Sequence, residues 1–465
     1  MNRIVVIGGG ISGLAAAHRA LELNQAAQVT IVEASDRLGG IIQTEFRDGF
    51  LLERGPDSFI SEKPQAIALA QRLGLESQLV QTNEEFRRSF IVRGGRLRAV
   101  PEGFQLMAPS RMWPFITSDI FSLAGKARMA ADLFLPRKST NGTTDESLAS
   151  FVRRRLGEEA LARMAQPMVG GIYTADPETL SLRATLPRFL DMEQKHRSLI
   201  LAMARQGRAQ KTGTSGARYS LFLSFDRGMQ VLVDALRTRI NADFRLKTRV
   251  RRVSLDKRWR ISTDRGEEFE ADGVCLAVPA YVAASLLSDV HEQLAQRLGQ
   301  IKYASTATIN FAYRRAAIKH PLNGFGFVVP FIEKRSLIAC TFSSVKFSGR
   351  APEDHVLLRA FAGGALQPEI FALDEAEMVK RVESDLRELL GIREDPRFIE
   401  IAKWARSMPQ YEVGHLDRVN EIEALVNEIP GLALAGNAYR GAGIPDCIRS
   451  GEAAAEYLLN QRASA

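Results

Sequence analysis

Two short apolar runs near the start of the chain are separated by a stretch in which apolar residues recur with helical spacing. Ile4 to Ile7 is uninterrupted by polar residues, which is typical of a buried parallel strand. Leu14 to Leu23 has the helical pattern, and Val29 to Val32 is again continuously apolar. This order predicts a strand, a helix and a second parallel strand, as in a doubly wound α/β domain.

The other end of the chain has a similar order. Leu432 to Ala435 predicts a strand, Gly436 ends it, and Gly441 and Gly443 lie in the loop that follows. A helix is expected from Asp446 to about Leu459. The two ends therefore predict two parts of one domain, with the middle of the chain inserted between them.

The inserted middle contains both helical and strand-like patterns. The pattern is mainly helical over residues 104–210, and Glu375 to Leu390 predicts an amphipathic helix. A hairpin is expected over residues 89–100. Further strands are expected over residues 244–253, 259–262, 273–278, 308–313, 326–329, 337–342 and 356–361.

A glycine-rich turn, Gly8 to Gly13, joins the first strand to the first helix. Gly8 permits a tight turn, Gly10 lets a pyrophosphate approach the backbone, and Gly13 lets the helix pack closely on the strand. The free N–H groups and the positive end of the helix dipole favour phosphate at this point. Glu33 follows the second strand and can accept hydrogen bonds from ribose hydroxyls, which disfavours NADP. The turn therefore predicts a dinucleotide site.

The segment after Glu33 favours FAD over a nicotinamide cofactor. Gly39 and Gly40 let the chain run close along the cofactor, and Arg37 could offset phosphate charge. This extension resembles that of FAD enzymes of the amine-oxidase type. The C-terminal glycine loop and helix are suited to lie under isoalloxazine O2 and N1, where they would stabilise negative charge on reduced flavin. An ordinary strand–turn–helix is the alternative for that loop.

Composition excludes several other kinds of site. The chain has 465 residues, 45% of them hydrophobic and 25% charged, which suits two or three domains. Its three cysteines and six histidines show no CxxC, HxH or HExxH spacing. We therefore expect a reducing compartment, no disulfide and no metal.

The formal net charge of +8 suits nucleic acid, an anionic membrane or an acidic substrate. No nucleic-acid-binding motif accompanies the charge, so we expect no nucleic-acid partner. No secretory signal precedes the first strand, and no run of about 18 apolar residues occurs. We expect a cytoplasmic protein, with peripheral contact at the inner face of the cell membrane left open. The apolar residues between Phe104 and Phe134 fit either a membrane face or a helical core.

Several longer segments carry a specific pattern. The segments are Gly8 to Gly13, Val32-Glu33-Ala34-Ser35, Glu53-Arg54-Gly55-Pro56-Asp57-Ser58, Gly170-Gly171-Ile172-Tyr173, Lys195-His196-Arg197-Ser198-Leu199-Ile200, Met408-Pro409-Gln410-Tyr411 and Gly443-Ile444-Pro445-Asp446-Cys447-Ile448. With these segments the chain resembles the protoporphyrinogen oxidases, the flavoenzymes of late haem synthesis, over nearly its whole length. The His-Arg-Ser and Pro-Asp-Cys segments are not general features of flavoproteins, so the resemblance is specific.

The resemblance implies an α/β protein of mixed α+β character: a Rossmann-like FAD-binding domain with an inserted mixed-sheet substrate domain and an α-helical membrane-binding domain. We expect the FAD-binding domain to comprise residues 1–85, 225–280 and 400–465. The substrate domain would comprise residues 86–103 and 281–399, and the helical domain residues 104–224.

The resemblance also implies FAD-dependent oxidation of a porphyrinogen to a porphyrin in haem biosynthesis, with O2 as acceptor. Six electrons would leave in three two-electron steps, each passing a hydride from a methylene bridge to flavin N5. No catalytic side chain is expected, because the cofactor carries out the difficult step. A homodimer and hand-off of the product to ferrochelatase are left open.

The resemblance and the glycine motifs together give the candidate site residues. Those for the substrate are Arg88, Phe325, Gly326, Val328 and Phe361; relatives often carry Arg where Ser89 stands, so Arg88 or Arg87 would replace it. Those for FAD are Gly8, Gly9, Gly10, Ile11, Ser12, Gly13, Glu33, Ala34, Arg37, Gly39, Gly40, Ile41, Gly55, Pro56, Asp57, Ser58, Val250, Trp404, Gly436, Ala442, Gly443 and Ile444.

Two substrates fit the resemblance. Protoporphyrinogen IX bears two propionates and coproporphyrinogen III bears four, and we favour the first. Another amine-oxidase-type enzyme, such as a polyamine oxidase or a carotenoid desaturase, is a rival within the same fold. A flavin-binding sensor without catalysis and a nucleic-acid binder are rivals of other classes.

Overall fold

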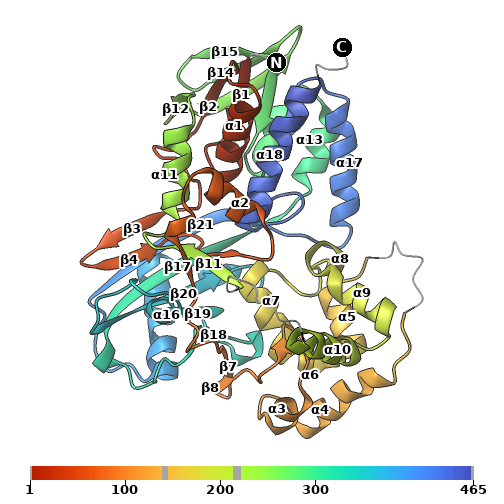
Figure 1. The fold of residues 1–465 in the computed structure, drawn as a ribbon, viewed down its shortest axis with the longest axis vertical. Helices are drawn as coiled ribbons and strands as arrows, with labels where there is room; N and C mark the ends of the chain where they lie inside the picture. Colours follow the sequence, from red (N-terminus) through yellow and green to blue (C-terminus); the bar gives the residue numbers. More distant parts are fainter. Residues whose placement is uncertain (1–2, 139–144, 213–220, 462–465) are drawn as a thin grey trace.

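Three regions make up the computed structural model, which describes residues 3–138, 145–212 and 221–461. Figure 1 shows a parallel sheet with its helices at the top, a second, larger sheet at the lower left and a group of helices at the lower right. Both ends of the chain lie in the upper region, so the other two regions are inserted into it.

The upper region is built on a five-stranded parallel sheet whose strands are covered on both faces. Ile4 and Val6 of β1 face one core, whereas Val5 and Ile7 face the other. This explains why the strand is continuously apolar. The strand order is β12 (Asp243–Arg245), β2 (Gln28–Val32), β1 (Arg3–Ile7), β16 (Gly273–Leu276) and β22 (Leu432–Leu434).

Helices cover one face of this sheet, and helices with a small antiparallel sheet cover the other. The first face carries α1 (Ile11–Leu23), α2 (Gln65–Arg72), α11 (Gln230–Arg239) and α18 (Ile444–Asn460). The second carries β13 (Val250–Leu255), β14 (Trp259–Thr263), β15 (Glu268–Ala271), α12 (Ala280–Leu287), α13 (Glu292–Gly299) and α17 (His415–Asn427).

One predicted strand of this region is wrong. Residues 244–253 do not form a single strand but contribute to two sheets, as the end of β12 and the start of β13. Lys247 has φ +53° in the turn between them, and no strand can continue through that backbone conformation.

The lower left region is a seven-stranded mixed sheet. Only the pair β18–β7 is parallel. Helix α16 (Glu375–Leu390), predicted with these bounds from its apolar pattern, packs on one face. The strand order is β21 (Phe398–Pro409), β17 (Tyr303–Arg314), β20 (His355–Gly363), β19 (Ala339–Phe342), β18 (Gly326–Val328), β7 (Phe90–Arg93) and β8 (Arg96–Ala99).

The lower right region is mainly helical and has its own core. One short hairpin, β9 (Phe104–Gln105) and β10 (Ala108–Pro109), interrupts the predicted helical pattern. The helices are α3 (Met112–Thr117), α4 (Leu123–Ala130), α5 (Leu148–Arg155), α6 (Glu158–Ala160), α7 (Gln166–Tyr173), α8 (Leu182–Thr185), α9 (Pro187–His196) and α10 (Leu199–Thr212).

Shorter elements connect the three regions. The hairpin of β3 (Thr44–Arg47) and β4 (Phe50–Glu53) leads towards the seven-stranded sheet. A three-stranded sheet follows, with strand order β5 (Phe59–Ile60), β11 (Phe222–Phe225) and β6 (Leu79–Gln81). Helices α14 (Ser343–Lys346) and α15 (Pro368–Ala372) accompany the larger sheet.

Two of the expected domain boundaries do not follow the packing. A boundary at residue 400 would cut β21, which pairs with β17 along most of its length. A boundary at residue 280 would assign α12 and α13 to the substrate domain, although both helices pack on the core of the five-stranded sheet. Apolar pattern alone does not say against which sheet a helix packs.

Helices α1 and α18 lie against each other unusually closely. An added Cβ on Gly451 would lie 2.1 Å from the carbonyl oxygen of Ser12. The pairing of Ser12 with Gly451 and the ion pair of Arg19 with Glu456 show that the two helices run parallel. Gly451 is therefore the position that permits the close contact.

We predict that Gly451→Ala lowers stability by about 1–3 kcal/mol, because the added methyl group meets backbone atoms that cannot move independently. The melting temperature of the holoprotein measures this effect. The control is Gly299→Ala at the exposed end of α13, where the nearest atom to a new Cβ is 4.0 Å away and no loss is expected. Equal melting temperatures for the two variants would contradict the role of Gly451.

Candidate functional site

The loop between β1 and α1 is held against the segment that contains Gly39. The N–H of Gly39 donates to the carbonyl of Gly9 at 2.8 Å, and Gly10 pairs with Gly39 as an isolated bridge. Gly8 has φ +107°, and an added Cβ on Gly13 would lie 1.9 Å from the Gly8 carbonyl oxygen. The structure thus requires glycine at both positions, as the motif predicts.

Glu33 lies at the centre of the adjoining backbone. Its carboxylate accepts hydrogen bonds from the N–H of Gly9 at 2.7 Å and from the N–H of Ser35 at 2.8 Å. Its own N–H donates to the carbonyl of Arg245, and its carbonyl accepts from the N–H of Thr248. The chain that leads to Val250 therefore runs beside Glu33.

The C-terminal loop and α18 form the second half of the site. Gly436 has φ +136°, and an added Cβ there would have no atom within 4 Å. Gly443 is the exposed N-cap of α18, and no side chain caps this helix. Since Ser12 faces Gly451, the start of α18 extends about 9 Å beyond the start of α1, at about 1.5 Å of rise per residue. The two helix N-termini are therefore offset along parallel axes.

Residues Glu53 to Ser58, which we call the strap, connect this site to the seven-stranded sheet. An added Cβ on Gly55 would lie 1.7 Å from the Ile41 carbonyl oxygen, so the strap runs directly against the segment after Gly40. The carbonyl of Arg54 accepts hydrogen bonds from Trp404 Nε1 at 2.9 Å and from the hydroxyl of Thr308 at 2.5 Å. The structure thus brings Trp404 to the strap.

These residues fit an FAD molecule. The N-cap residues of α1 and α18 supply no capping side chain. Both helix N-termini therefore present N–H groups that can donate hydrogen bonds to an anion or to a carbonyl oxygen. A Cβ on Gly10 would meet only the Cα of Gly40, at 4.0 Å, which leaves open space beside the loop. When bound, FAD would place its pyrophosphate at the first N-terminus and its ring near the second.

A buried charge cluster lies beside the strap. Lys346 Nζ contacts the Asp57 carboxylate at 3.0 Å, and Arg359 lies 3.6 Å from it. Burial raises the pKa of Asp57, but the charges of Lys346 and Arg359 outweigh burial and hold the pKa below its ordinary value. Burial lowers the pKa of Arg359, although Asp57 opposes this. The cluster leaves cationic charge next to the expected flavin segment.

One face of the seven-stranded sheet is directed towards the strap. Val328 pairs with Ala339, Ala339 with Phe361, and Phe361 with Thr308, so the four side chains share one face in a row. Thr308 in this row bonds to the strap, as described above. The opposite face packs on α16. Val328 and Phe361 therefore lie on the face nearest the expected flavin.

Three other predicted residues, Arg37, Arg88 and Ser58, make hydrogen bonds within the protein. Arg37 donates to the carbonyls of Leu38, Gly40 and Ile42, so it fastens its own loop, and burial lowers its pKa. Arg88 is exposed, and its carbonyl accepts the N–H of Phe325 at 2.8 Å. Ser58 donates to Asp57 and accepts from Lys346.

The remaining candidates vary in exposure. Gly326 has φ +143° at the start of β18, where an added Cβ would lie 2.1 Å from the Cys340 carbonyl oxygen. Phe325 is half-buried just before it. Ile11, Ser12 and Ile444 are buried, Ala34 and Ile41 are exposed, and Pro56 and Ala442 are half-buried.

Sequence reasoning missed four residues that build the site: Thr308, Lys346, Arg359 and Gly451. Arg359 lies in a strand pattern, and only its interruption of the apolar run of β20 could have drawn attention to it. Lys346 and Thr308 carry no local signal, because their role depends on how the sheet meets the strap. Gly451 lies in a helical pattern, where a glycine suggests a close contact without naming its partner.

The fold and the site define an FAD-dependent oxidoreductase. The family model for flavin-containing amine oxidoreductases matches residues 11–459, and the chain belongs to this family. The sequence prediction of FAD as cofactor is confirmed.

The chain is similar to coproporphyrinogen III oxidase of Bacillus subtilis (strain 168), at 36% identity over 98% of this chain and 97% of the relative. It is 29% identical to the chloroplastic protoporphyrinogen oxidase of Nicotiana tabacum, over 96% and 83%. A solved protein of Exiguobacterium sp. 255-15, provisionally named a protoporphyrinogen oxidase, is 32% identical with TM-score 0.88, and the match covers 98% of each chain.

We predict that Gly10→Val weakens FAD binding roughly 10- to 100-fold, because its side chain would occupy the open space beside the loop. Fluorescence titration of the apoprotein with FAD measures the affinity. The melting temperature of the apoprotein should stay unchanged, since the new side chain meets few protein atoms. A variant that is purified as yellow as the parent protein would contradict this use of the loop.

Proposed function

We propose that this chain is a porphyrinogen oxidase, which removes six electrons from the macrocycle in three two-electron steps with O2 as acceptor. The observation that carries the proposal is the row of Val328, Ala339, Phe361 and Thr308 on the sheet face that meets the strap. Val328, Ala339 and Phe361 of this row offer an apolar wall beside the expected flavin, which suits a flat, largely apolar substrate.

The side chains around this wall would orient the substrate. Arg359, two residues before Phe361 on the same face of β20, lies over the Phe361 ring at 4.7 Å from its centroid and is itself buried, so the guanidinium supports one face of the ring. Val328 lies near Gly171 at the end of α7, which places the helical region at the edge of the wall. Bound FAD supplies the hydride acceptor, and the protein contributes orientation and exclusion of water.

The choice of substrate rests on the relatives. The higher identity to a coproporphyrinogen III oxidase than to a protoporphyrinogen oxidase favours coproporphyrinogen III, in place of the protoporphyrinogen IX that we favoured from the sequence. The net charge of +8 suits a substrate with four carboxylates. Arg88 remains our candidate for a propionate contact, since the residue is exposed and its carbonyl oxygen and Cγ lie beside Gly324, next to Phe325.

The two porphyrinogens distinguish the proposals directly. We expect anaerobic addition of coproporphyrinogen III to bleach the flavin absorbance, and readmission of O2 to restore it with growth of a porphyrin Soret band. Protoporphyrinogen IX should bleach it more slowly, and the reverse order would select protoporphyrinogen IX. If neither bleaches the flavin while a polyamine does, the amine-oxidase rival is correct.

We predict that Phe361→Ala raises KM about tenfold, because one aromatic wall of the slot is lost. The FAD content should not change, since the ring lies on the sheet and not in the glycine loops. Phe46→Ala, an exposed aromatic residue on β3, is the control and should leave KM unchanged. A large loss of FAD in Phe361→Ala would contradict the assignment of this ring to the substrate.

The division into three domains is also part of the proposal. The five-stranded sheet would bind FAD, the seven-stranded sheet would bind the substrate, and the helical region would contact a membrane surface. We propose neither a homodimer nor hand-off of the product to ferrochelatase.

The membrane contact is supported by exposed apolar side chains at one end of the helical region. Phe115 and Phe121 pack in its core, so the predicted apolar stretch contributes to both a core and a surface. The exposed members are Trp113, Ile116, Leu123 and Phe134, with Lys126 and Arg128 on the same helices. Among the described residues, no helix is long and apolar enough to span a bilayer. Contact would therefore be peripheral.

We predict that Leu123→Ser/Phe134→Ser reduces sedimentation with vesicles of mixed phosphatidylglycerol and phosphatidylcholine, because two inserted side chains are lost. Phe46→Ser, on an exposed strand far from this end, is the control and should sediment like the parent protein. If the parent protein itself does not sediment with the vesicles, the helical region has no membrane role.

A further inference from the structure

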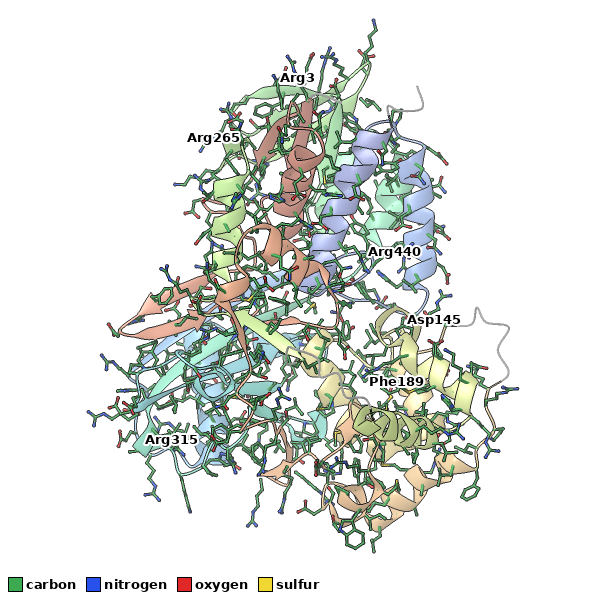
Figure 2. The ribbon with its side chains drawn as sticks, in the orientation of Figure 1. Arg3, Asp145, Phe189, Arg265, Arg315 and Arg440 are labelled. Atoms are coloured by element: carbon green, nitrogen blue, oxygen red, sulfur yellow. The ribbon has the colours of Figure 1, made fainter. Side chains whose placement is uncertain are left out.

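Tyr411 lies where the three regions meet. It follows β21, and its carbonyl accepts the N–H of Ser181 from the helical region at 2.7 Å. The preceding residue, Gln410, donates its N–H to Lys302, which lies just before β17. In Figure 2, Arg440 lies beside α17 and Asp145 lies below it, at the upper edge of the helical region. The Tyr411 side chain is buried and points into the C-terminal loop.

Residues 436–443, the C-terminal flavin loop, are held by Tyr411 and His415 together. The Tyr411 hydroxyl donates to the carbonyl of Asn437 and accepts the N–H of Gly441 at 3.0 Å. The His415 ring stacks on the Tyr411 ring, with centroids 4.1 Å apart and planes within 13°. His415 Nε2 lies 2.8 Å from the carbonyl of Tyr439. The two stacked rings thus hold three alternate residues of the loop, Asn437, Tyr439 and Gly441.

The loop depends on these contacts because it belongs to no sheet or helix. Gly436 and Gly441 have φ of +136° and +138°, which bend the chain away from any regular element. The N–H of Gly436 is held by the hydroxyl of Ser450 at 3.1 Å, on the α18 side. The open side of the loop, where an added Cβ on Gly436 would have no atom within 4 Å, is the side we assign to the flavin.

We propose that Tyr411 is a positioning residue for the flavin: its hydroxyl fixes the C-terminal flavin loop so that N–H groups at the start of α18 point at the pyrimidine edge of the ring. Reduced flavin carries negative charge at this edge, and oriented N–H groups stabilise that charge. The inference requires bound FAD but not a porphyrinogen substrate.

Tyr411→Phe tests this role, because it removes the hydroxyl and keeps the ring that stacks on His415. We expect the balance between reduced and oxidised flavin to shift about tenfold towards the oxidised form. This corresponds to a two-electron midpoint potential about 30 mV more negative. Reductive titration against a reference dye measures it, and FAD binding should weaken by a smaller factor.

The matched control is Tyr313→Phe in the seven-stranded sheet, whose buried hydroxyl has no hydrogen-bond partner among the described residues. Its potential should equal that of the parent protein. An unchanged potential in Tyr411→Phe, or an equal shift in the control, would overturn the proposal. If Tyr411→Phe does not retain FAD, Ser450→Ala provides the test. This variant removes the hydrogen bond to the Gly436 N–H, so the midpoint potential of the flavin should also become more negative. None of these readouts uses a porphyrinogen, so failure of the proposed function would leave them interpretable.

Discussion

Two uncapped helix N-termini, offset along parallel axes, are the feature on which the rest of the structure depends. In the part of the chain that the structure describes, neither N-cap residue supplies a capping side chain, and the first N–H groups of a helix have no partner within the helix. Their spacing is set by the contact of Gly451 with the Ser12 carbonyl, which brings α18 so close to α1 that no other residue fits. A long cofactor with phosphates at its middle and an electron-accepting ring at its end satisfies both termini at once.

The strap connects this geometry to the seven-stranded sheet. Its carbonyl groups at Glu53, Arg54 and Gly55 accept hydrogen bonds from Asn310, Thr308, Trp404 and Arg359, all of which are side chains of the seven-stranded sheet. Buried carbonyls require such partners, so the sheet cannot shift along the strap without losing them. The row of Val328, Ala339 and Phe361 on the sheet is therefore fixed relative to the strap, and through Gly55 relative to Ile41.

Local chemistry was predictable from the sequence, and contacts between regions were not. The turn at Gly8 to Gly13 and the helix Glu375–Leu390 follow from steric requirements and apolar spacing within a few residues. The break at Lys247 has no such signal, because strand formers lie on both sides of it. Arg359 is a clearer case: a charged residue in a buried strand is understood only once Asp57 and the strap lie beside it. The roles of these residues could not be predicted because their partners are distant in the sequence, not because the interactions are weak.

The His-Arg-Ser segment shows that a motif specific to a family need not lie at its cofactor. Ser198 donates to the buried carboxylate of Asp132, which also pairs with the fully buried Arg155, and Arg155 in turn donates to the carbonyl of Arg197. A buried ion pair is tolerated only when such hydrogen bonds complete it. The network fixes the turn that contains Asp132, two residues before the exposed Phe134. The segment therefore maintains the shape of the helical region at the place where its apolar surface is exposed.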